Sequence, residues 1–548
     1  MALHPAIEER LARLAPDQRA AATAPPGPVL CVAPAGSGKT TTLVARICWL
    51  VANGADPAGI TAVTFNKRAA DELGERLAAA LAPLDTAGMQ PRVRTFHALG
   101  REILVEAGVG VRNVVDRADV IRRLNRKQPS AAAFRRIDDA FSRLKLDLMM
   151  DSDELRRMAA DGAPLPVDEE LASAFVAYQE WLGRNDSLDF DDLVRRALLE
   201  LRGVSQLRER WQARCRTLLV DEVQDVDRSQ LELALTLTGD RQDIFLVGDD
   251  DQTIYAWRLA DVRRVLGLAA SLPGLRRIDL VTNYRCPRAV VQRAVRLVER
   301  NHERFAKQIR AAPGAAGELT LAPDPGDDVA RARRLLTHWL PAAPGQHAVL
   351  ARTNAELAPF AAVALERGLA YRAAEDGLLL DDPSIDEALE DMTGSPPDTP
   401  PAVALAGTRR TGRQMTALLA WSLGARNVAE LRQAIAEARQ RRTELRREDA
   451  DLILATAHGT KGLEFDHVAC IGLDDGVFPS RRTLEETDDP VRAMEEERRL
   501  AYVAWTRAKK SLTLVYDPAA PSVFMREAFT DEELGLSPAV GNSRQAAA

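Results

Sequence analysis

Hydrophobic positions in this chain alternate between short uninterrupted runs and longer stretches with helical spacing. Val29 to Val32 form an apolar run, A-P-A-G-S-G-K-T follows, and apolar residues then recur at helical intervals as far as Leu50, before Gly54. This order predicts a strand, a loop and a helix. A second such unit has its strand at 62–64 and its helix at 69–81.

The same pattern divides the rest of the chain. From about Ala98 to Arg208 the spacing is mainly helical, as at Phe175, Tyr178 and Leu182. Further strands are predicted at 218–220, 245–247, 280–281, 348–350, 452–454, 468–471 and 512–515. Two α/β domains, each interrupted by an insertion, explain this order. The second insertion contains S-P-P-D-T-P-P, residues 395–401, which indicates a loop or linker, and from about Thr530 we expect a disordered tail.

Length and composition agree with a multidomain globular protein. At 548 residues the chain is too long for one hydrophobic core, and 46% hydrophobic with 28% charged residues is typical of a soluble protein. No apolar run reaches the roughly 18 residues of a membrane span, and acids occupy the N-terminus where a signal peptide would be basic and then apolar. We therefore expect a cytoplasmic protein without membrane contact.

Cysteine and charge exclude some functions and leave others open. The 5 cysteines are scattered and form no C-x-x-C pair, which argues against a disulfide framework, a zinc knuckle and an iron–sulfur cluster. A net charge of −7 gives no support to a generally basic nucleic-acid binder but is compatible with a basic cleft. Only 8 of the 73 cations are Lys, and two of these, Lys39 and Lys461, lie in motifs described below.

A phosphate-binding loop follows the first strand. Its backbone N–H groups are expected to surround the phosphates of a nucleotide, Lys39 to reach the β and γ oxygens, and Thr40 to bind Mg²⁺. Ala33 stands where the strict pattern has Gly, so the match is to A-x-x-G-x-G-K-T. The alternative, a Gly-rich turn without a ligand, is disfavoured by the flanking strand and helix. The expected nucleotide-binding residues here are Ala35, Gly36, Ser37, Gly38, Lys39, Thr40 and Thr41.

Acidic residues follow two later strands. Asp221 is expected to bind the magnesium shell and Glu222 to polarise the attacking water, a reading that gains its weight from the upstream phosphate loop. Gln252 places an amide able to contact a phosphate a few residues before two large aromatics. Of Asp249, Asp250 and Asp251, which precede it, we expect at most one to act beyond electrostatics and helix capping.

Arginine and aromatic residues complete the candidate chemistry. Arg285 in T-N-Y-R-C-P and Arg507 in A-W-T-R-A-K-K are placed to supply charge to a γ-phosphate, although each alone also fits a surface cation. Aromatic rings recur near small polar residues and suit stacking on the bases of a single strand, with a core role as the alternative for any one of them. These residues are Phe65, Phe96, His97, Phe190, Tyr255 and Trp257.

The ordered series of motifs resembles the UvrD/Rep/PcrA-type superfamily 1 DNA helicases over nearly the whole chain. The motifs are D-Q-R, A-G-S-G-K-T, T-F-N-K-R-A-A, T-F-H-A-L, D-F-D-D-L, L-V-D-E-V-Q-D, V-G-D-D-D-Q-T-I-Y-A-W-R, N-Y-R, A-H-G-T-K-G-L-E-F and E-E-E-R-R-L-A-Y-V-A-W-T-R-A. The resemblance implies an α/β fold of two RecA-like P-loop domains, each interrupted by a mainly helical insertion, with ATP between them. It also implies 3′ to 5′ movement on single-stranded DNA, in repair, recombination or replication.

The resemblance assigns further roles by motif. It implies that Gln18 reads the adenine, Tyr284 stacks on it, Glu464 contacts the ribose and Gln252 senses the γ-phosphate, with Arg285 and Arg507 as arginine fingers. It places Phe65, Phe190, Tyr255 and Trp257 on the bases, with His97 and His458 beside the strand. Thr95, Phe96 and Arg258 belong to the same DNA-contacting motifs.

The resemblance also implies domain bounds. These are 1–97 and 209–279 for the first RecA-like domain, 98–208 for its insertion, 280–379 and 447–520 for the second, 380–446 for a shortened 2B-like insertion, and 521–548 for a tail. Because the 2B subdomain of the family grips duplex and regulates unwinding, its reduction puts autonomous unwinding in doubt but not ATP-driven translocation.

Three functions remain in competition. The first is an ATP-dependent helicase and translocase acting on single-stranded and tailed duplex DNA. The second is the same motor working only with a protein partner, a loading factor or a nuclease, for instance in anti-phage defence. The third is an ATP-gated DNA-binding switch with little turnover, against which the intact Lys39, Glu222 and Gln252 argue.

Overall fold

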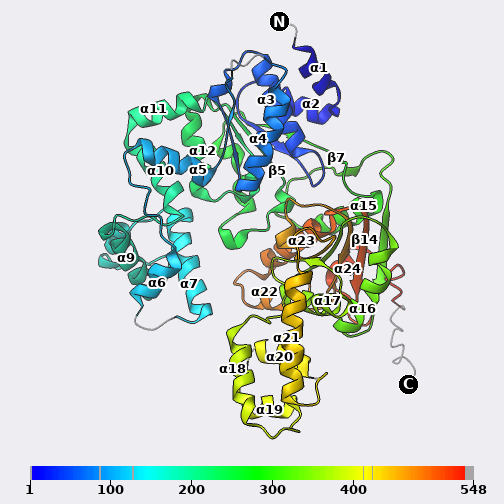
Figure 1. The fold of residues 1–548 in the computed structure, drawn as a ribbon. Helices are drawn as coiled ribbons and strands as arrows, with labels where there is room; N and C mark the ends of the chain where they lie inside the picture. The colour runs from blue at the N-terminus through cyan, green and yellow to red at the C-terminus, as the bar shows by residue number, and fades with distance from the viewer. Residues whose placement is uncertain (1–2, 85–87, 126–128, 412, 423, 537–548) are drawn as a thin grey trace, which may run out of the picture. The chain divides into compact units, whose positions relative to one another are not determined.

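The described chain divides into two compact units (Figure 1). A computed structural model describes residues 3–84, 88–125, 129–411, 413–422 and 424–536. Unit 1 comprises Met1–Tyr284 and His302–Arg310, and unit 2 comprises Arg285–Asn301 and Ala311–Ala548. Each unit contains a parallel sheet flanked by helices, which confirms the predicted fold class.

Parallel strands form the sheet of unit 1 in the order β3-β2-β4-β5-β1-β6. The strands inside the sheet are buried along their length, because runs such as V-L-C-V have no polar face to present to water. The strands are β1 Val29–Val32, β2 Ile60–Thr64, β3 Arg92–Thr95, β4 Thr217–Val220, β5 Ile244–Gly248 and β6 Arg276–Asp279.

Helices of unit 1 begin where the chain leaves the strands. The Asn66 and Thr95 side chains accept hydrogen bonds from backbone N–H groups in the first turns of α4 and α5, which fixes where these helices start. The helices around the sheet are α1 Pro5–Ala12, α2 Pro16–Ala22, α3 Lys39–Ala52, α4 Lys67–Leu81, α5 Phe96–Glu106, α10 Asp192–Gly203, α11 Ser205–Arg214, α12 Arg228–Thr238, α13 Val262–Leu266 and α14 Leu268–Ser271.

The insertion of unit 1 has a core of its own. Phe141, Phe175 and Tyr178 pack in a cluster separate from the one on the sheet, whereas α5 and α10 contribute their apolar side chains to the sheet cluster. Figure 1 shows this part as a lobe apart from the sheet. Its helices are α6 Arg117–Leu124, α7 Ala131–Ser142, α8 Ser152–Ala160 and α9 Glu169–Arg184, with a π-helical turn at Arg143–Asp147.

Unit 2 repeats the architecture with strand order β11-β12-β10-β13-β14-β9, all parallel. These strands are β9 Glu318–Pro323, β10 His347–Ala351, β11 Tyr371–Arg372, β12 Leu452–Thr456, β13 Phe465–Cys470 and β14 Ala508–Tyr516. The short strands β7 Thr282–Asn283 and β8 Arg310–Ala311 lie where the chain passes from one unit to the other. The flanking helices are α15 Arg288–Val298, α16 Asp328–His338, α17 Asn354–Arg367, α22 Arg481–Glu485, α23 Pro490–Trp505 and α24 Val523–Ala528.

The insertion of unit 2 is helical and projects from the sheet in Figure 1. Its helices are α18 Pro383–Asp391, α19 Pro401–Gly407, α20 Arg413–Ser422 and α21 Val428–Leu445. Ile385, Leu431 and Ile435 belong to the same buried cluster as the sheet residues Val349 and Leu454, so the insertion shares its core with unit 2. The Pro-rich stretch 395–400 is irregular up to the start of α19, as predicted.

Two predictions about local structure were wrong. The strand expected at 280–281 is β6, at Arg276–Asp279, and Leu280 is a fully buried residue beyond its end. Three of the four residues of β6, which lies at the sheet edge, are charged, and this concealed the strand in the hydrophobic pattern. The tail expected from Thr530 is ordered at its start, because Leu534 is buried and Arg293 pairs with Glu533. The end of that predicted tail, 537–548, lies outside the described residues.

Among the described helices, none combines the length and the apolar character that crossing a membrane requires.

Candidate functional site

The phosphate loop joins β1 to α3 in a conformation that requires glycine. Gly36 and Gly38 have φ of 67° and 85°, in the left-handed region. A Cβ on Gly38 would lie 2.6 Å from Gln18 Nε2. The loop ends at the N-terminus of a 14-residue helix, where free backbone N–H groups and the helix dipole attract anions. The hydroxyl of Ser37 is buried without a hydrogen-bond partner in the described chain, which suits a phosphate oxygen at this loop.

Gln18 and Tyr284 flank this loop. Gln18 lies in α2, is buried, and donates from Nε2 to the Ser37 carbonyl at 2.8 Å. The Tyr284 backbone N–H donates to the Gly36 carbonyl at 2.8 Å, and its side chain is half exposed. The structure therefore places the two residues predicted to contact adenine on the phosphate loop.

The two predicted catalytic acids follow β4 beside Lys39. The Lys39 ammonium lies 3.2 Å from Glu222 Oε2. Glu222 has φ of 51°, a left-handed conformation that is strained for a residue with a side chain and is found most often at functional sites. Burial and the neighbouring Glu222 carboxylate raise the pKa of Asp221 to about 7, the behaviour of a carboxylate that lacks a full complement of positive charge. Thr40 follows Lys39 at the start of α3 and is partly exposed.

A chain of hydrogen bonds connects these acids to Gln252. Gln224 Nε2 donates to Glu222 Oε2 at 2.6 Å, and Gln224 Oε1 accepts from the Asp249 backbone N–H at 3.0 Å. Asp249 Oδ2 accepts from Gln252 Nε2 at 2.7 Å and from the Ala35 N–H of the phosphate loop at 3.1 Å. The predicted water-activating acid, the phosphate loop and the predicted sensor are thus one network.

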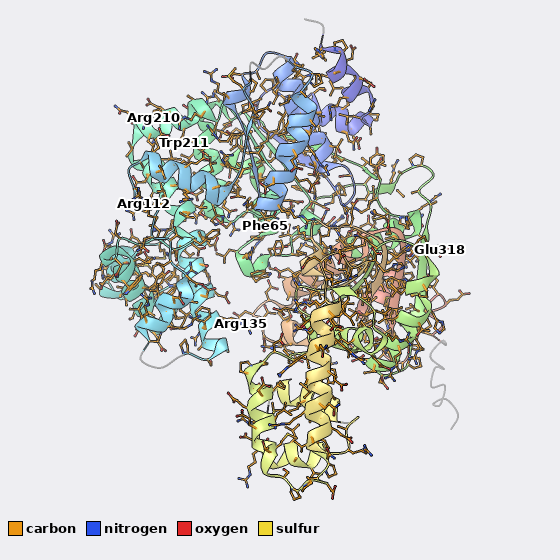
Figure 2. The ribbon with its side chains drawn as sticks, viewed as in Figure 1. Phe65, Arg112, Arg135, Arg210, Trp211 and Glu318 are labelled. Carbon is orange, nitrogen blue, oxygen red and sulfur yellow. The ribbon has the colours of Figure 1, made fainter. Side chains whose placement is uncertain are left out.

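Aromatic rings gather a few residues beyond Gln252. Phe65, labelled in Figure 2, follows β2 and stacks on Tyr255 with centroids 5.3 Å apart and an interplanar angle of 5°. Tyr255 meets Trp257 edge to face at 5.9 Å, and Arg258 lies over the Trp257 ring at 4.6 Å. Trp257 is 59% exposed, so one large ring faces solvent at the end of this stack.

A second aromatic pair lies between α5 and the loop before α10. His97 and Phe190 stack with centroids 3.9 Å apart, and Phe190 is 58% exposed. Burial lowers the pKa of His97 to about 4, so its imidazole is neutral at pH 7. Thr95 caps α5 through its hydroxyl, and Phe96 is buried in the core. The structure therefore gives Phe96 a packing role, and we leave it out of the candidate DNA surface.

The remaining predicted residues belong to unit 2. Arg285 Nε lies 2.8 Å from Glu464 Oε2, and Arg285 Nη1 donates to the Thr506 carbonyl at 3.3 Å. Arg507 is buried and donates to the carbonyls of Val503 and Leu463 at 2.8 and 3.1 Å. In unit 2, both predicted arginine fingers and the predicted ribose contact therefore lie close to Leu463 and Thr506.

His458 lies elsewhere in unit 2, in the 3-10 turn after β12. Burial lowers its pKa to about 4, with Arg352 and Lys461 adding to the effect. Its imidazole is neutral at pH 7 and lines a cavity of about 600 Å³ together with Arg352, Arg442 and Arg446.

Two buried lysines, Lys145 and Lys307, were missed by the sequence reasoning. Lys145 is fully buried, and its ammonium lies 2.8 Å from both Asp189 and Asp192, the acids on either side of Phe190. Lys307 contacts the three acids before Gln252. The scarcity of Lys in this chain was the available signal, because it makes each remaining Lys a candidate for a special role.

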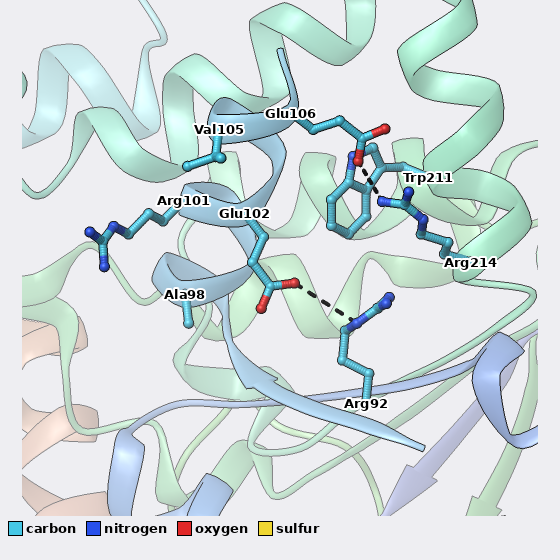
Figure 3. A pocket seen from close by; sticks show the side chains of 8 residues that line it. All are labelled: Arg92, Ala98, Arg101, Glu102, Val105, Glu106, Trp211 and Arg214. Atoms are coloured by element: carbon cyan, nitrogen blue, oxygen red, sulfur yellow. Dashed lines mark hydrogen bonds and ion pairs between the residues drawn. The ribbon is translucent and has the colours of Figure 1, made fainter. Parts of the chain in front are cut away.

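Unit 1 also contains a groove that none of the predicted site residues lines (Figure 3). It measures about 510 Å³ and is lined by Trp211, by Arg92, and by α5 residues such as Glu102. Arg92 pairs with Glu102 at 3.8 Å, and Glu106 pairs with Arg210 at 2.8 Å and also with Arg214. Two of its three lining arginines, Arg92 and Arg214, are paired with the lining acids Glu102 and Glu106, so little net positive charge is left for phosphate, and we assign the nucleotide to the loop.

Known proteins match the chain over most of its length. Residues 14–273 match the model of the UvrD/REP helicase N-terminal domain, and residues 420–518 match that of the UvrD-like helicase C-terminal domain. The ATP-dependent DNA helicase UvrD2 of Mycobacterium tuberculosis is 31% identical over 93% of this chain and 79% of its own length. DNA helicase II of Escherichia coli is 28% identical over 91% and 84%, and the helicase Rep of the same organism is 26% identical over 91% and 90%.

Proposed function

This chain belongs to the UvrD/Rep family of ATP-dependent DNA helicases, and we propose that it couples ATP hydrolysis to 3′ to 5′ movement along single-stranded DNA. The observation that carries the proposal is the hydrogen-bonded connection from Glu222 through Gln224 and Asp249 to Gln252, which stands three residues before Tyr255. A motor requires such a connection between the bond that is hydrolysed and the surface that grips the strand.

The residues at the phosphate loop fit Mg-ATP. In our proposal Lys39 contacts the β- and γ-phosphates, Thr40 and Asp221 hold Mg²⁺, and Glu222 accepts the proton of the attacking water. Bound Mg²⁺ supplies positive charge to the phosphates. The Ser37 hydroxyl, which is buried without a hydrogen-bond partner in the described chain, supports this assignment because a phosphate oxygen would supply one.

The nucleotide also meets residues that read its base, sugar and terminal phosphate. We assign Gln18 and Tyr284 to the adenine, Glu464 to the ribose, Gln252 to the γ-phosphate, and Arg285 with Arg507 to the charge that develops on that phosphate. The hydrogen bonds that the Gln18 side chain and the Tyr284 backbone N–H donate to the phosphate loop support the first pair.

The exposed rings are the proposed DNA contacts. Trp257 and Phe190 face solvent and are each backed by a second ring, Tyr255 and His97 respectively, so each can stack on a base without first being ordered. Phe65 supports the first group from below Tyr255. Thr95, Arg258 and His458 complete the proposed surface beside the strand.

Unwinding polarity tests this function directly. The chain alone, with ATP and Mg²⁺, is expected to separate a duplex with a 3′ single-stranded tail and to leave a matched 5′-tailed duplex intact, as followed by strand release in a fluorescence-quenching assay. ATP hydrolysis stimulated by single-stranded DNA without release of either duplex would instead support a motor that requires a partner, the reading favoured by the short insertion α18–α21. Absence of DNA-stimulated hydrolysis would overturn the motor.

Replacing Trp257 with Ala tests the DNA surface. We expect DNA-stimulated ATP turnover at subsaturating single-stranded DNA to fall about ten-fold, because stacking on one ring stabilises a bound base by roughly 1–3 kcal/mol. Basal turnover without DNA should stay within two-fold. Trp181→Ala, on the partly buried face of α9, serves as a control for loss of an indole elsewhere. An equal fall in basal and stimulated turnover for Trp257→Ala would contradict the assignment of this ring to DNA.

A further inference from the structure

Lys307 is a buried cation at the centre of an acidic cluster. Its side chain is 0% exposed, and its ammonium lies 2.8 Å from Asp249 Oδ1 and 2.9 Å from Asp251 Oδ2 and also pairs with Asp250. The segment His302–Arg310 that carries it belongs to unit 1, although the residues on both sides belong to unit 2. A stretch of chain that connects the two units is therefore anchored directly before Gln252.

The cluster needs both of its cations. Asp249, Asp250 and Asp251 are at most 1% exposed, and burying three carboxylates is costly unless each is paired. Arg304 supplies the second cation and binds only Asp251 of the three, at 2.7 and 2.9 Å. Burial opposes the charged form of Lys307, but the three acids outweigh it and raise its pKa, so the ammonium stays charged.

Of the three acids, Asp249 is the one whose side chain is hydrogen-bonded both to Gln252 and to the phosphate loop. Asp249 Oδ1 accepts from the Lys307 ammonium at 2.8 Å and from the Asp251 backbone N–H at 3.2 Å, whereas Oδ2 accepts from Gln252 Nε2 at 2.7 Å and from the Ala35 N–H at 3.1 Å. The carboxylate thus has Lys307 on one oxygen and the predicted sensor with the phosphate loop on the other. Fixing the first oxygen fixes the direction in which the second one points.

We propose that Lys307 is a positioning residue for ATP hydrolysis, which orients Asp249 so that this carboxylate holds the Gln252 amide in its working geometry. This inference rests on the proposed contact of Gln252 with the γ-phosphate. Its consequence is specific: loss of Lys307 affects the recognition of the third phosphate and leaves the contacts to the first two largely intact.

The test compares two nucleotides on the full chain. For Lys307→Met, we expect the affinity for a fluorescent, non-hydrolysable ATP analogue to fall about ten-fold while the affinity for the matching ADP derivative stays within two-fold. DNA-stimulated kcat should fall in parallel. A merely structural role would weaken both nucleotides alike, so the ratio of the two affinities is the decisive readout.

Two further variants separate positioning from folding. Arg304→Met removes the second cation of the cluster from the carboxylate of Asp251, whereas the Asp249 carboxylate keeps Lys307, and this variant should keep the nucleotide ratio of the parent protein. Lys307→Met with Asp250→Asn removes one cation and one acid, so the net charge of the cluster returns to that of the parent. This double variant should regain the melting temperature but not the ratio.

Three outcomes would overturn the proposal. They are an unchanged ratio in Lys307→Met, an equal loss of ratio in Arg304→Met, and recovery of the ratio in the charge-balanced double variant. Gln252→Ala provides the separate check on the proposed function. If it keeps the ratio while Lys307→Met loses it, the assignment of Gln252 to the γ-phosphate fails, and Lys307 affects recognition of the third phosphate by a route that does not pass through Gln252.

Discussion

Replacing Glu222 with Gln is expected to lower DNA-stimulated ATP hydrolysis by about 10³-fold. A positioned general base contributes roughly 10²- to 10⁴-fold to a rate, and the amide has the same shape but cannot accept the proton of the attacking water. Glu222 meets the requirement of geometry, because its carboxylate lies 3.2 Å from Lys39 and is held by Gln224 at 2.6 Å. The strained backbone at Glu222 directs the side chain into this position.

The measurement separates binding from chemistry. Glu222→Gln should bind an ATP analogue at least as tightly as the parent, while single-turnover hydrolysis with saturating single-stranded DNA becomes very slow. Asp227→Asn is the matched control, since Asp227 is a nearby buried acid that caps α12 and the amide oxygen can still accept from Gln230. Turnover of Glu222→Gln within ten-fold of the parent would exclude Glu222 as the base.

The sequence predicted which residues of unit 1 come together wherever those residues directly follow strands. In a parallel α/β sheet, the residues that follow successive strands meet at one edge, so Gly36–Thr40 after β1, Asp221 after β4 and Gln252 after β5 come together. The rings at Phe65 and Tyr255 follow β2 and β5 and meet for the same reason. The local sequence pattern was sufficient to predict these contacts, because a parallel sheet brings the ends of its strands together.

The sequence did not predict the contacts of segments that lack a helical or strand-like hydrophobic pattern. Lys307 lies 58 residues from Asp249 and in no regular element, so nothing near it in the sequence announces the acids that it neutralises. Lys145 reaches Asp189 from a π-helical turn that helical spacing does not reveal. Phe96 shows the opposite error, because its position in a motif predicted to contact DNA suggested an exposed ring, whereas the ring is buried in the sheet cluster.

These buried ion pairs suggest how the two predicted surfaces stay ordered. Lys145 binds the acids that flank Phe190, and Lys307 binds the acids that precede Gln252 and the Tyr255–Trp257 pair. Each loop has an exposed ring and contains acids that form a buried ion pair with a lysine. Removing one partner of such a pair destabilises the fold, because the other charge is left buried and unpaired. An exposed ring on a rigid loop loses little entropy when it stacks on a base.

Replacing Arg285 with Ala is expected to lower DNA-stimulated kcat by about 10³-fold, with ADP affinity within three-fold of the parent. An arginine finger acts on charge that develops in the transition state, and its loss typically costs 10³- to 10⁵-fold. Glu464 at 2.8 Å and the Thr506 carbonyl at 3.3 Å orient the Arg285 guanidinium before the nucleotide binds. The expected loss of about 10³-fold is the lower end of the range for an arginine finger.

Arg293→Ala is the matched control for that experiment. Arg293 also belongs to unit 2, pairs with Glu533 and donates to the Ala528 carbonyl at 2.9 Å, so its loss removes an arginine with comparable contacts and no assigned chemistry. Stimulated kcat of Arg293→Ala should stay within two-fold of the parent. If Arg285→Ala matched that control, or lost ADP affinity as strongly as kcat, Arg285 would be a structural residue of unit 2, and the charge at the γ-phosphate would have to come from Arg507 and Lys39 alone.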